Sequence, residues 1–228
     1  MGVLASVGFA GTTGTELNAY DSALVKVTGF TPSMQITAGG RGRLSSNNSI
    51  AQYYHTATPA SADYWVSTDM HIASSSSGTK ASGPMVRMDS AADTGYHFRL
   101  NTRTSVGLYR RQSGSATILG STSAVTVSAG STYGMKIDAA GSTISVYWDG
   151  AGSPTIQQTD SNITAAGHGG FRWSDVGSQS DSTAEHVDNL LIEEAGGVTA
   201  FIPIVGRGPG MALAGNGGGL AGNSTGSS

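Results

Sequence analysis

Hydrophobic and polar residues alternate with a period of two along much of the chain between residues 60 and 194. Successive side chains of an extended strand point to opposite faces, so this alternation predicts strands that are buried on one face. The clearest run spans residues 63–73, with Trp65 and His71 on the polar face. The predicted core-facing residues of this run are Tyr64, Val66, Met70 and Ile72.

Short polar turns separate further runs of this kind and predict antiparallel hairpins. The predicted pairs are 83–89 with 95–101, 106–111 with 116–119, and 133–138 with 143–148. A last strand over 187–193 is expected to pair back near the N-terminal region. Shorter strands are expected near 23–28, 41–45 and 50–54, and no segment shows a convincing helical period. The pattern predicts an all-β, antiparallel two-sheet sandwich in one domain, residues 1–194.

The composition changes at residue 195. Residues 195–228 contain 11 glycines and a single charged residue, Arg207, so this segment cannot build a core of its own. We expect an extended, apolar and Gly-rich C-terminal arm that docks on neighbouring subunits. The expected assembly residues are Phe201, Ile202, Pro203, Ile204, Val205 and Arg207.

Charge and cysteine content narrow the range of partners. Charged residues make up 12% of the chain and the net charge is −3, which gives no attraction to nucleic acid or to anionic membranes. No stretch approaches the length of apolar chain that a membrane span requires, so we expect no membrane insertion. The chain has no cysteine, which rules out disulfides and thiolate metal sites.

The acidic residues do not predict a catalytic pair. Glycoside hydrolysis needs two carboxylates flanking one bond. Glu185 and Asp188 are three residues apart and Glu193 and Glu194 are adjacent, so in a strand each pair diverges. Asp69 is alone on its strand. We therefore expect no catalytic residues and no enzymatic activity.

Metal and cofactor sites are not predicted either. Asp175 with Asp181, or Asp89 with Asp93, offer hard oxygen ligands for calcium, but ordinary turn capping is the favoured interpretation. The histidines have no metal-ligand spacing and are expected to be surface or packing residues. They are His55, His71, His97, His168 and His186.

One group of side chains suggests a sugar-binding face. If Trp65 and His71 point away from the core, and the polar residues of the two following strands occupy the corresponding face, flat stacking surfaces are combined with hydrogen-bond donors. The residues of this hypothesis are Trp65, His71, His97, Arg99, Tyr109 and Arg111. The alternative is that Trp65 and Tyr109 fill the gap between two sheets or an interface, because large aromatic residues are usually mostly buried.

The succession of strands and turns also resembles a known fold. The matching segments are Phe9 to Leu17, Tyr64 to Ile72, Gly83 to Met88, Val106 to Arg111, Lys136 to Gly150, Gly169 to Phe171 and Val187 to Leu190. They resemble the laminin-G-like, concanavalin-A-like jelly roll, particularly versions found in bacteriophage virion proteins. The resemblance implies two stacked antiparallel sheets, a concave face often used for carbohydrate, and no obligatory catalysis.

The resemblance and the arm together predict a non-enzymatic bacteriophage virion structural protein, located in a virion assembled in the host cytoplasm. A minor tail component, at the tail tip or in a fibre, is the favoured role. A capsid decoration protein and a stand-alone carbohydrate-binding module are the alternatives, and a glycan lyase or hydrolase is the weakest. The expected partners are other virion subunits, including copies of this chain, and a host-surface glycan.

Overall fold

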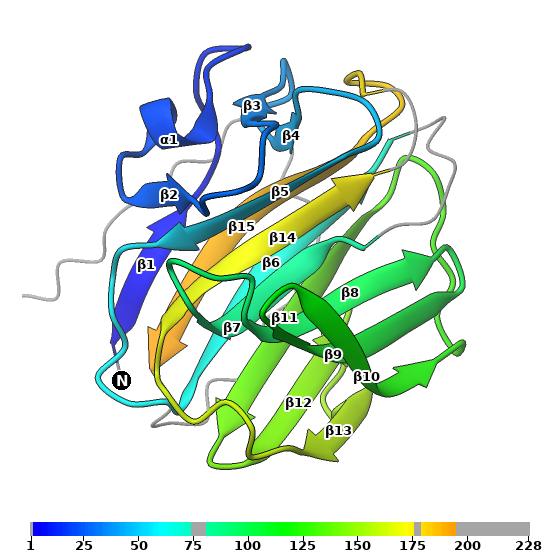
Figure 1. Cartoon of the computed structure of the whole chain (residues 1–228). Helices are drawn as coiled ribbons and strands as arrows, with labels where there is room; N and C mark the ends of the chain where they lie inside the picture. Colours follow the sequence, from blue (N-terminus) through cyan, green and yellow to red (C-terminus); the bar gives the residue numbers. More distant parts are fainter. Residues whose placement is uncertain (1, 74–80, 176–178, 195–228) are drawn as a thin grey trace, which may run out of the picture.

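The computed structural model describes residues 2–73, 81–175 and 179–194, and the side chain of Asp175 is outside this description. These residues form an all-β sandwich of two antiparallel sheets (Figure 1). The strands of sheet A, in spatial order, are β13 (Ile156–Thr159), β12 (Thr143–Trp148), β11 (Thr132–Ala140), β6 (Tyr64–Ile72), β15 (Glu185–Glu194), β4 (Gly42–Leu44) and β3 (Met34–Ile36), with β1 (Val3–Val7) also pairing with β15. Sheet B contains β10 (Ser115–Thr122), β9 (Ser105–Gln112), β8 (Gly95–Thr102), β7 (Gly83–Met88), β14 (His168–Asp175), β5 (Ser49–His55) and β2 (Leu24–Lys26). The predicted fold class is confirmed.

The three predicted hairpins are confirmed as β7–β8, β9–β10 and β11–β12. The turn between β9 and β10 is centred on Ser113 and Gly114, whose φ angles are 49° and 86°. Two consecutive positive φ angles match the right-handed twist of the flanking strands, which is why a small residue followed by glycine reverses the chain tightly here.

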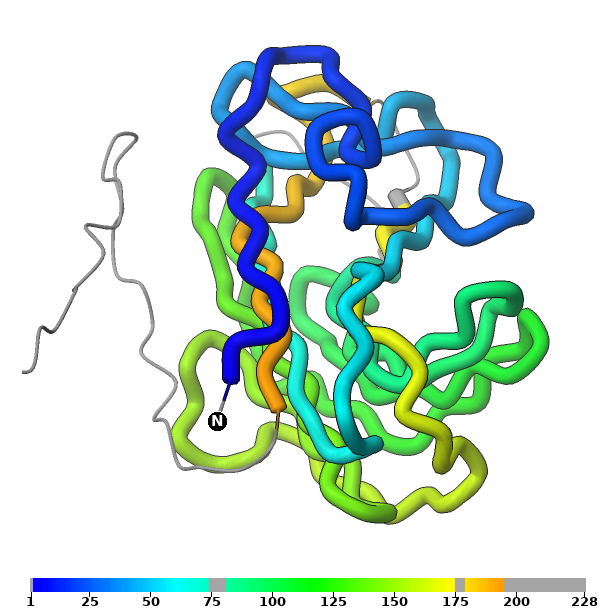
Figure 2. Tube along the Cα trace, turned by 90° about the vertical axis from the view of Figure 1, so that its left-hand side faces the viewer, coloured from blue at the N-terminus to red at the C-terminus, as the bar shows by residue number. Residues whose placement is uncertain are grey.

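The predicted last strand is β15, and it does pair back to the N-terminal region. Val7 of β1 lies opposite Leu190, and on its other side β15 pairs with β6. Figure 2 shows β1 beside β15 in one layer, with β5 and β14 in the other. The structure adds strands that the pattern did not predict: β1, β3 and β13. It also adds one short helix, α1 (Leu17–Tyr20).

The added elements are short, with five residues or fewer each. In β13 only Ile156 is buried, so period-two alternation gives almost no signal. The four-residue helix α1 buries Leu17, and the hydroxyl of Tyr20 donates a hydrogen bond to the carbonyl of Gly8 at 2.6 Å. These elements are held by tertiary contacts rather than by local propensity.

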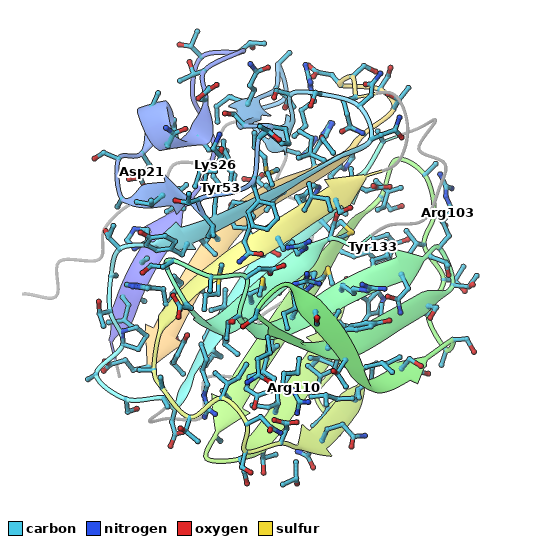
Figure 3. All side chains as sticks on the ribbon, viewed as in Figure 1. Asp21, Lys26, Tyr53, Arg103, Arg110 and Tyr133 are labelled. Carbon is cyan, nitrogen blue, oxygen red and sulfur yellow. The ribbon has the colours of Figure 1, made fainter. Side chains whose placement is uncertain are left out.

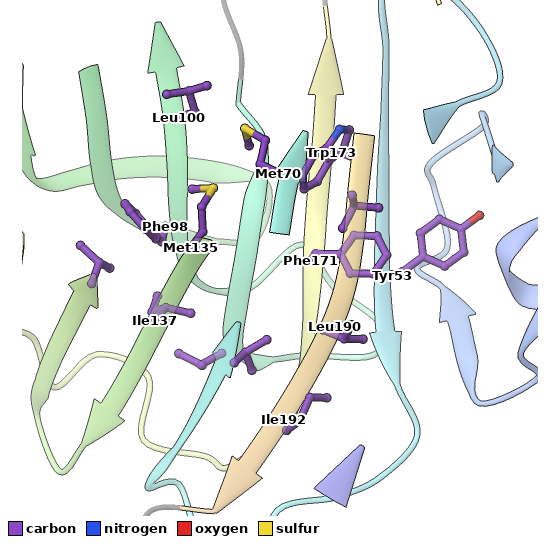
Figure 4. Packing of buried hydrophobic residues seen from close by; sticks show 14 of the residues in the cluster. Tyr53, Met70, Phe98, Leu100, Met135, Ile137, Phe171, Trp173, Leu190 and Ile192 are labelled. Carbon is purple, nitrogen blue, oxygen red and sulfur yellow. The ribbon is translucent and has the colours of Figure 1, made fainter. Parts of the chain in front are cut away.

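The inner faces of the two sheets meet in one hydrophobic core. Its largest fully buried side chains include Trp173, Tyr53, Tyr64, Tyr96, Phe9, Phe98 and Phe171. Figure 4 shows Phe171 and Trp173 of sheet B and Leu190 and Ile192 of sheet A among the residues of this core. The residues predicted to face the core from β6 are buried as expected. Their odd-numbered neighbours, such as Trp65, therefore point outward.

A buried arginine joins the end of this core to the surrounding loops. The Arg87 guanidinium donates to the carbonyls of Ala62 at 2.9 Å, Ile163 at 2.8 Å and Gly141 at 2.6 Å. These three acceptors come from separate loops. One side chain thus satisfies three backbone groups that water does not reach easily.

The predicted arm lies outside the described residues. This applies to Phe201, Ile202, Pro203, Ile204, Val205 and Arg207. Within the described ranges no helix is long and apolar enough to span a membrane.

Candidate functional site

Four of the six residues predicted for a sugar-binding face share the outer surface of sheet B. In β8, Phe98 and Leu100 are buried in the core, so the residues between them alternate outward. The neighbouring strand β9 alternates in the same way, with Val106 and Leu108 in the core. The outward residues of β8, β9 and β14 on this surface form the arginine face: His97, Arg99, Asn101, Tyr109, Arg111 and Arg172.

Trp65 and His71 are not part of the arginine face, so the predicted grouping of six residues is wrong. Both side chains point outward from β6, which belongs to sheet A, on the opposite side of the sandwich. The Lys136 ammonium lies 4.6 Å from the centre of the Trp65 ring, and the His71 ring stacks on His186 at 5.6 Å. A period of two shows which side of its own strand a residue takes, but not which sheet the strand joins. Trp65 and Tyr109 do not fill the gap between the sheets, and the other form of that alternative, their burial in an interface, stays a prediction.

Arg99, Asn101 and Tyr109 form a flat, hydrogen-bonded platform on the arginine face. The Arg99 guanidinium carbon lies 3.8 Å from the centre of the Tyr109 ring. Arg99 Nε and the Tyr109 hydroxyl both donate to Asn101 Oδ1, at 2.6 and 3.1 Å. Besides Asn101, the Tyr109 side chain interacts with the Arg99 guanidinium. No further acceptor among the described residues contacts the two terminal nitrogens of Arg99, so they present donors in a fixed orientation.

A glycine makes room for this platform. A Cβ atom on Gly107 would lie 2.6 Å from a ring carbon of Tyr109 and 2.9 Å from the side-chain nitrogen of Asn101. Both distances are too short for any side chain, so the platform depends on Gly107. Glycine inside a strand is a sequence signal for such a close approach.

The arginine face carries a cluster of buried charges. Asp93, from the loop between β7 and β8, accepts hydrogen bonds from Arg111 Nε at 2.6 Å and from Arg111 Nη2, and pairs with Arg172 Nη1 at 3.1 Å. Arg172 also donates to Gln52 Oε1 at 2.9 Å, and its guanidinium lies 4.9 Å from the centre of the Phe30 ring. One carboxylate thus serves two guanidinium groups that are 7% and 6% exposed.

His97 lies within this cluster and is completely buried. Burial, followed by the positive charges of Arg172, Arg111 and Arg99, holds its pKa well below the ordinary value, so the imidazole is neutral at pH 7. Neither ring nitrogen has a hydrogen-bond partner among the described residues. Burial, and then the charge of Arg111, also lowers the pKa of Arg172 to about 10, so this guanidinium remains charged at pH 7.

Strand register places a glycine on each side of Arg99. Ser82, just before β7, lies opposite Leu100, and Met85 lies opposite His97, which places Gly83 beside Arg99. On the other side, Gly107 of β9 is the direct partner of Arg99. Gly83 is also the partner of Arg172 on β14. Two arginines therefore lie two strands apart with only a glycine between them.

A pocket of about 720 Å³ opens beside the Phe30 end of the arginine face. It is rich in hydroxyl and amide groups, and its lining residues are Glu16, Gly29, Phe30, Thr31, Pro32, Ser33, Ser45, Ser46, Asn48, Ser49 and Ile50. Phe30 lines the pocket and also contacts Arg172. The volume lies within the range of small-ligand pockets.

The acidic residues considered for catalysis diverge as expected. Glu185 is buried, whereas Asp188 points outward from β15. The structure adds a pairing that the sequence did not predict, because Asp188 lies directly opposite Asp69 of β6. Burial raises the pKa of both carboxyls, and the charge of Asp188 adds to the effect on Asp69. Asn189 donates to Asp69 at 2.7 Å, and no described pocket adjoins this pair.

Three of the aspartates considered for calcium, Asp89, Asp93 and Asp181, have other roles, and the side chain of Asp175 lies outside the described residues. Asp89 caps its turn, accepting a hydrogen bond from the amide of Ala91 at 2.8 Å, as expected. Asp181 accepts from the amide of Ala38 at 3.0 Å and pairs with Arg43 at 2.8 Å. Within the part of the chain that the structure describes, no three His, Asp or Glu side chains gather as metal ligands would.

Comparison with known proteins identifies the fold. No family model matches the sequence, and no curated protein matches it. Among solved structures, the carbohydrate-binding module CBM66 from Bacillus subtilis is similar, with a TM-score of 0.59, 19% identity, and coverage of 75% of this chain and 96% of that one.

Two further solved structures share the architecture. A protein of unknown function with a galectin-like fold from Bacillus subtilis gives a TM-score of 0.59 at 12% identity, covering 84% of this chain and 96% of that one. The exoplasmic/lumenal domain of VIP36, in a form bound to Ca²⁺ and Man3GlcNAc, gives 0.57 at 9% identity, covering 81% and 88%. The chain therefore has the two-sheet jelly-roll fold found in carbohydrate-binding modules and lectins.

Proposed function

We propose that this protein is a non-catalytic glycan-binding module and that it binds its ligand on the arginine face. The observation that carries the proposal is the Arg99–Asn101–Tyr109 platform, in which a guanidinium is held flat on an aromatic ring with its terminal donors unused. Solved structures of the same fold include a carbohydrate-binding module and a glycan-bound lectin domain, which supports this class of function.

The platform suits a sugar for two physical reasons. A pyranose or furanose ring has an apolar C–H side that stacks on flat groups, and its hydroxyls accept hydrogen bonds from fixed donors. Asn101 and Tyr109 fix the plane of the Arg99 guanidinium, so little conformational entropy is lost when a ligand binds to it.

The chemistry of the arginine face favours binding without catalysis. Its carboxylate, Asp93, is engaged by both Arg111 and Arg172. Hydrolysis of a glycosidic bond needs an acid and a second carboxylate on either side of that bond. The carboxyl pair Asp69 and Asp188 lies on the opposite side of the sandwich and cannot serve a ligand on the arginine face.

A glycan array tests the proposal, using the wild-type chain and two single variants. We expect the wild type to bind at least one class of glycan, Tyr109→Ala to lose most of that binding, and Trp65→Ala to keep it. The two variants each remove a partly exposed aromatic side chain, but from opposite sides of the sandwich. Loss of binding in Trp65→Ala alone would place the site on sheet A, and no binding to any glycan would refute the proposal.

A second candidate is an assembly role in a bacteriophage virion, as a minor tail component or a capsid decoration protein. It is favoured by the sequence of residues 195–228, in which Phe201 to Val205 form an apolar cluster within a segment that has one charge. The test is the solution mass by light scattering of the full chain and of a chain ending at Glu194. An oligomer that becomes monomeric on truncation supports assembly through the arm, and an unchanged oligomer contradicts it.

A further inference from the structure

We propose that the glycan bound at the arginine face is acidic, and that its carboxylate or sulfate group binds the terminal nitrogens of Arg99. This inference rests on the proposed glycan-binding function and specifies its ligand. The shared chemistry of the two candidate groups is an oxyanion that accepts two parallel hydrogen bonds from one guanidinium.

The local charge of the arginine face is the first argument. Arg99, Arg111 and Arg172 act on one another and on His97, while Asp93 is the acid that acts on Arg172. Three guanidinium groups are therefore matched by one carboxylate. The whole chain carries a net charge of −3, so this positive excess is a local property of the arginine face.

Three other described arginines, Arg43, Arg110 and Arg87, each have a carboxylate nearby. Arg43 pairs with Asp181, and Arg110, which is labelled in Figure 3, pairs with Asp160. The buried Arg87 binds three carbonyls and lies 3.5 Å from Asp63. In contrast, Arg99 has an amide oxygen and an aromatic ring as its partners, and no carboxylate. Arg99 is the member of the cluster whose charge the fold leaves uncompensated.

The adjacent strand on one side of Arg99 adds no side chain to cover the guanidinium, because Gly83 occupies the neighbouring position on the β7 side. On the other side, the Tyr109 ring and the Asn101 amide lie over Gly107 of β9 and hold the guanidinium from there. The planar fork of Arg99 is oriented by Asn101, which leaves the two terminal nitrogens for a bidentate contact with the ligand.

Arg111 and Arg172 attract the anionic ligand through their positive charges rather than through hydrogen bonds to it. Both are almost fully buried, and Asp93 occupies several of their donors. Salt screens the field of buried charges less than that of exposed charges, so the excess positive charge acts on a ligand at Arg99. His97 adds a neutral, fully buried ring whose nitrogens have no described partner, which is a second unsatisfied polar group within the same cluster.

Stabilisation of the fold explains the contacts of only two of the three arginines. The Asp93 bonds to Arg111 and Arg172 hold the β7–β8 loop against the sheet, and this explains why those two arginines are buried. They do not explain Arg99, whose contacts are with Asn101 and Tyr109 of the same sheet. A bound oxyanion would pair with Arg99, the guanidinium of the cluster that Asp93 does not engage.

The test is isothermal titration with matched acidic and neutral oligosaccharides. The probes are oligogalacturonate, oligomannuronate and α-2,8-linked oligosialic acid, each compared with the same oligosaccharide after its carboxyl groups are reduced to alcohols. A 6-O-sulfated oligogalactose tests the sulfate source. The proteins are the full chain, Arg99→Gln, Arg99→Lys and the matched control Arg103→Gln. Arg103 lies on the turn between β8 and β9, so its replacement removes the same charge nearby (Figure 3).

We expect at least one acidic probe to bind, with its reduced form at least tenfold weaker. Arg99→Gln is expected to lower the affinity for the acidic probe by about tenfold to a hundredfold, which corresponds to the loss of a charge-assisted hydrogen bond. Arg99→Lys should lie between Arg99→Gln and wild type, and Arg103→Gln should bind like wild type. Higher salt should weaken acidic binding.

The outcomes separate the two proposals. Equal binding of the acidic and reduced forms would overturn the acidic ligand and leave the glycan-binding function standing. Binding of neutral glycans on the array, without binding of any acidic probe, would have the same meaning. Absence of binding to every glycan, with the fold intact by circular dichroism, would overturn the function itself. Equal losses in Arg99→Gln and Arg103→Gln would show that net charge rather than Arg99 controls binding, and would also overturn the inference.

Discussion

Replacing Asp93 by asparagine tests the buried charge cluster of the arginine face. The substitution keeps the size of the side chain but removes the carboxylate that pairs with Arg111 and Arg172. The side chain of Asp93 is 14% exposed, and those of its two partners are 8% and 7% exposed. Water therefore compensates poorly for the lost charge. We expect the variant to fold with clearly reduced stability.

The size of the effect follows from the number of bonds. Asp93 accepts two hydrogen bonds from Arg111 and one contact from Arg172, and each charge-assisted bond contributes about 1.5–3 kcal/mol. Asparagine keeps one acceptor oxygen but leaves two buried guanidinium groups without a counter-charge. Removal of one partner from a buried ion pair costs about 3–5 kcal/mol, and we expect a loss in this range. The melting temperature should fall by roughly 6–20 °C, at about 2–4 °C per kcal/mol for a domain of this size.

Urea denaturation followed by tryptophan fluorescence measures this loss, because Trp173 is completely buried. The matched control is Asp89→Asn, which makes the same chemical change on an exposed residue of the same loop. We expect the control to lose about 1 kcal/mol or less, which is typical of a surface turn cap. A loss for Asp93→Asn as small as that of the control would refute the view that the cluster depends on this carboxylate.

Three further predictions follow from single contacts. Arg87→Met leaves three backbone carbonyls, of which that of Ile163 is buried, without their donor and should cost about 1–3 kcal/mol in the free energy of unfolding, measured by urea denaturation; a loss under about 0.5 kcal/mol would contradict this role. Burial, and then the charge of His71, lowers the pKa of His186 from 6.5 to about 4, so the unfolded chain binds a proton that the folded chain does not. This histidine therefore lowers the free energy of unfolding as the pH drops from about 6.5 to about 4. Across this range the free energy of unfolding should fall less steeply with pH in His186→Phe than in the wild type. Equal pH slopes in the two proteins would contradict this prediction. Gly107→Ala should displace the Tyr109 ring and weaken glycan binding at least tenfold while the chain stays folded, and unchanged affinity by titration would count against the platform.

Local alternation was enough to predict most of the strands and the direction of their side chains. In β6, β8 and β9 the buried positions alternate with outward ones, so Trp65, Arg99 and Tyr109 leave the core, which is one of the two possibilities that the sequence left open for Trp65 and Tyr109. The sequence could not show that β6 and β8 belong to different sheets. That assignment depends on pairings between distant segments, such as β6 with β15, which no local pattern encodes.

Arg172, Asp93 and the strand glycines were not part of the predicted site. They differ in whether a sequence pattern could have indicated their roles. Arg172 lies between Phe171 and Trp173, both fully buried, so the same alternation pointed it outward. Asp93 comes from an irregular loop, and only the folded path of that loop brings it to the two arginines. The roles of the strand glycines required the register between strands, because their importance lies in what they leave uncovered.

The most direct test of glycan binding at the arginine face is a titration followed by NMR at the arginine Nε–H and tryptophan indole N–H groups. The ligand is the strongest glycan found on the array. The account predicts that the Nε–H signal of Arg99 shifts in a saturable way, while the indole signal of Trp65, on the opposite side of the sandwich, stays in place. A saturable shift of Trp65 with Arg99 unchanged would contradict it.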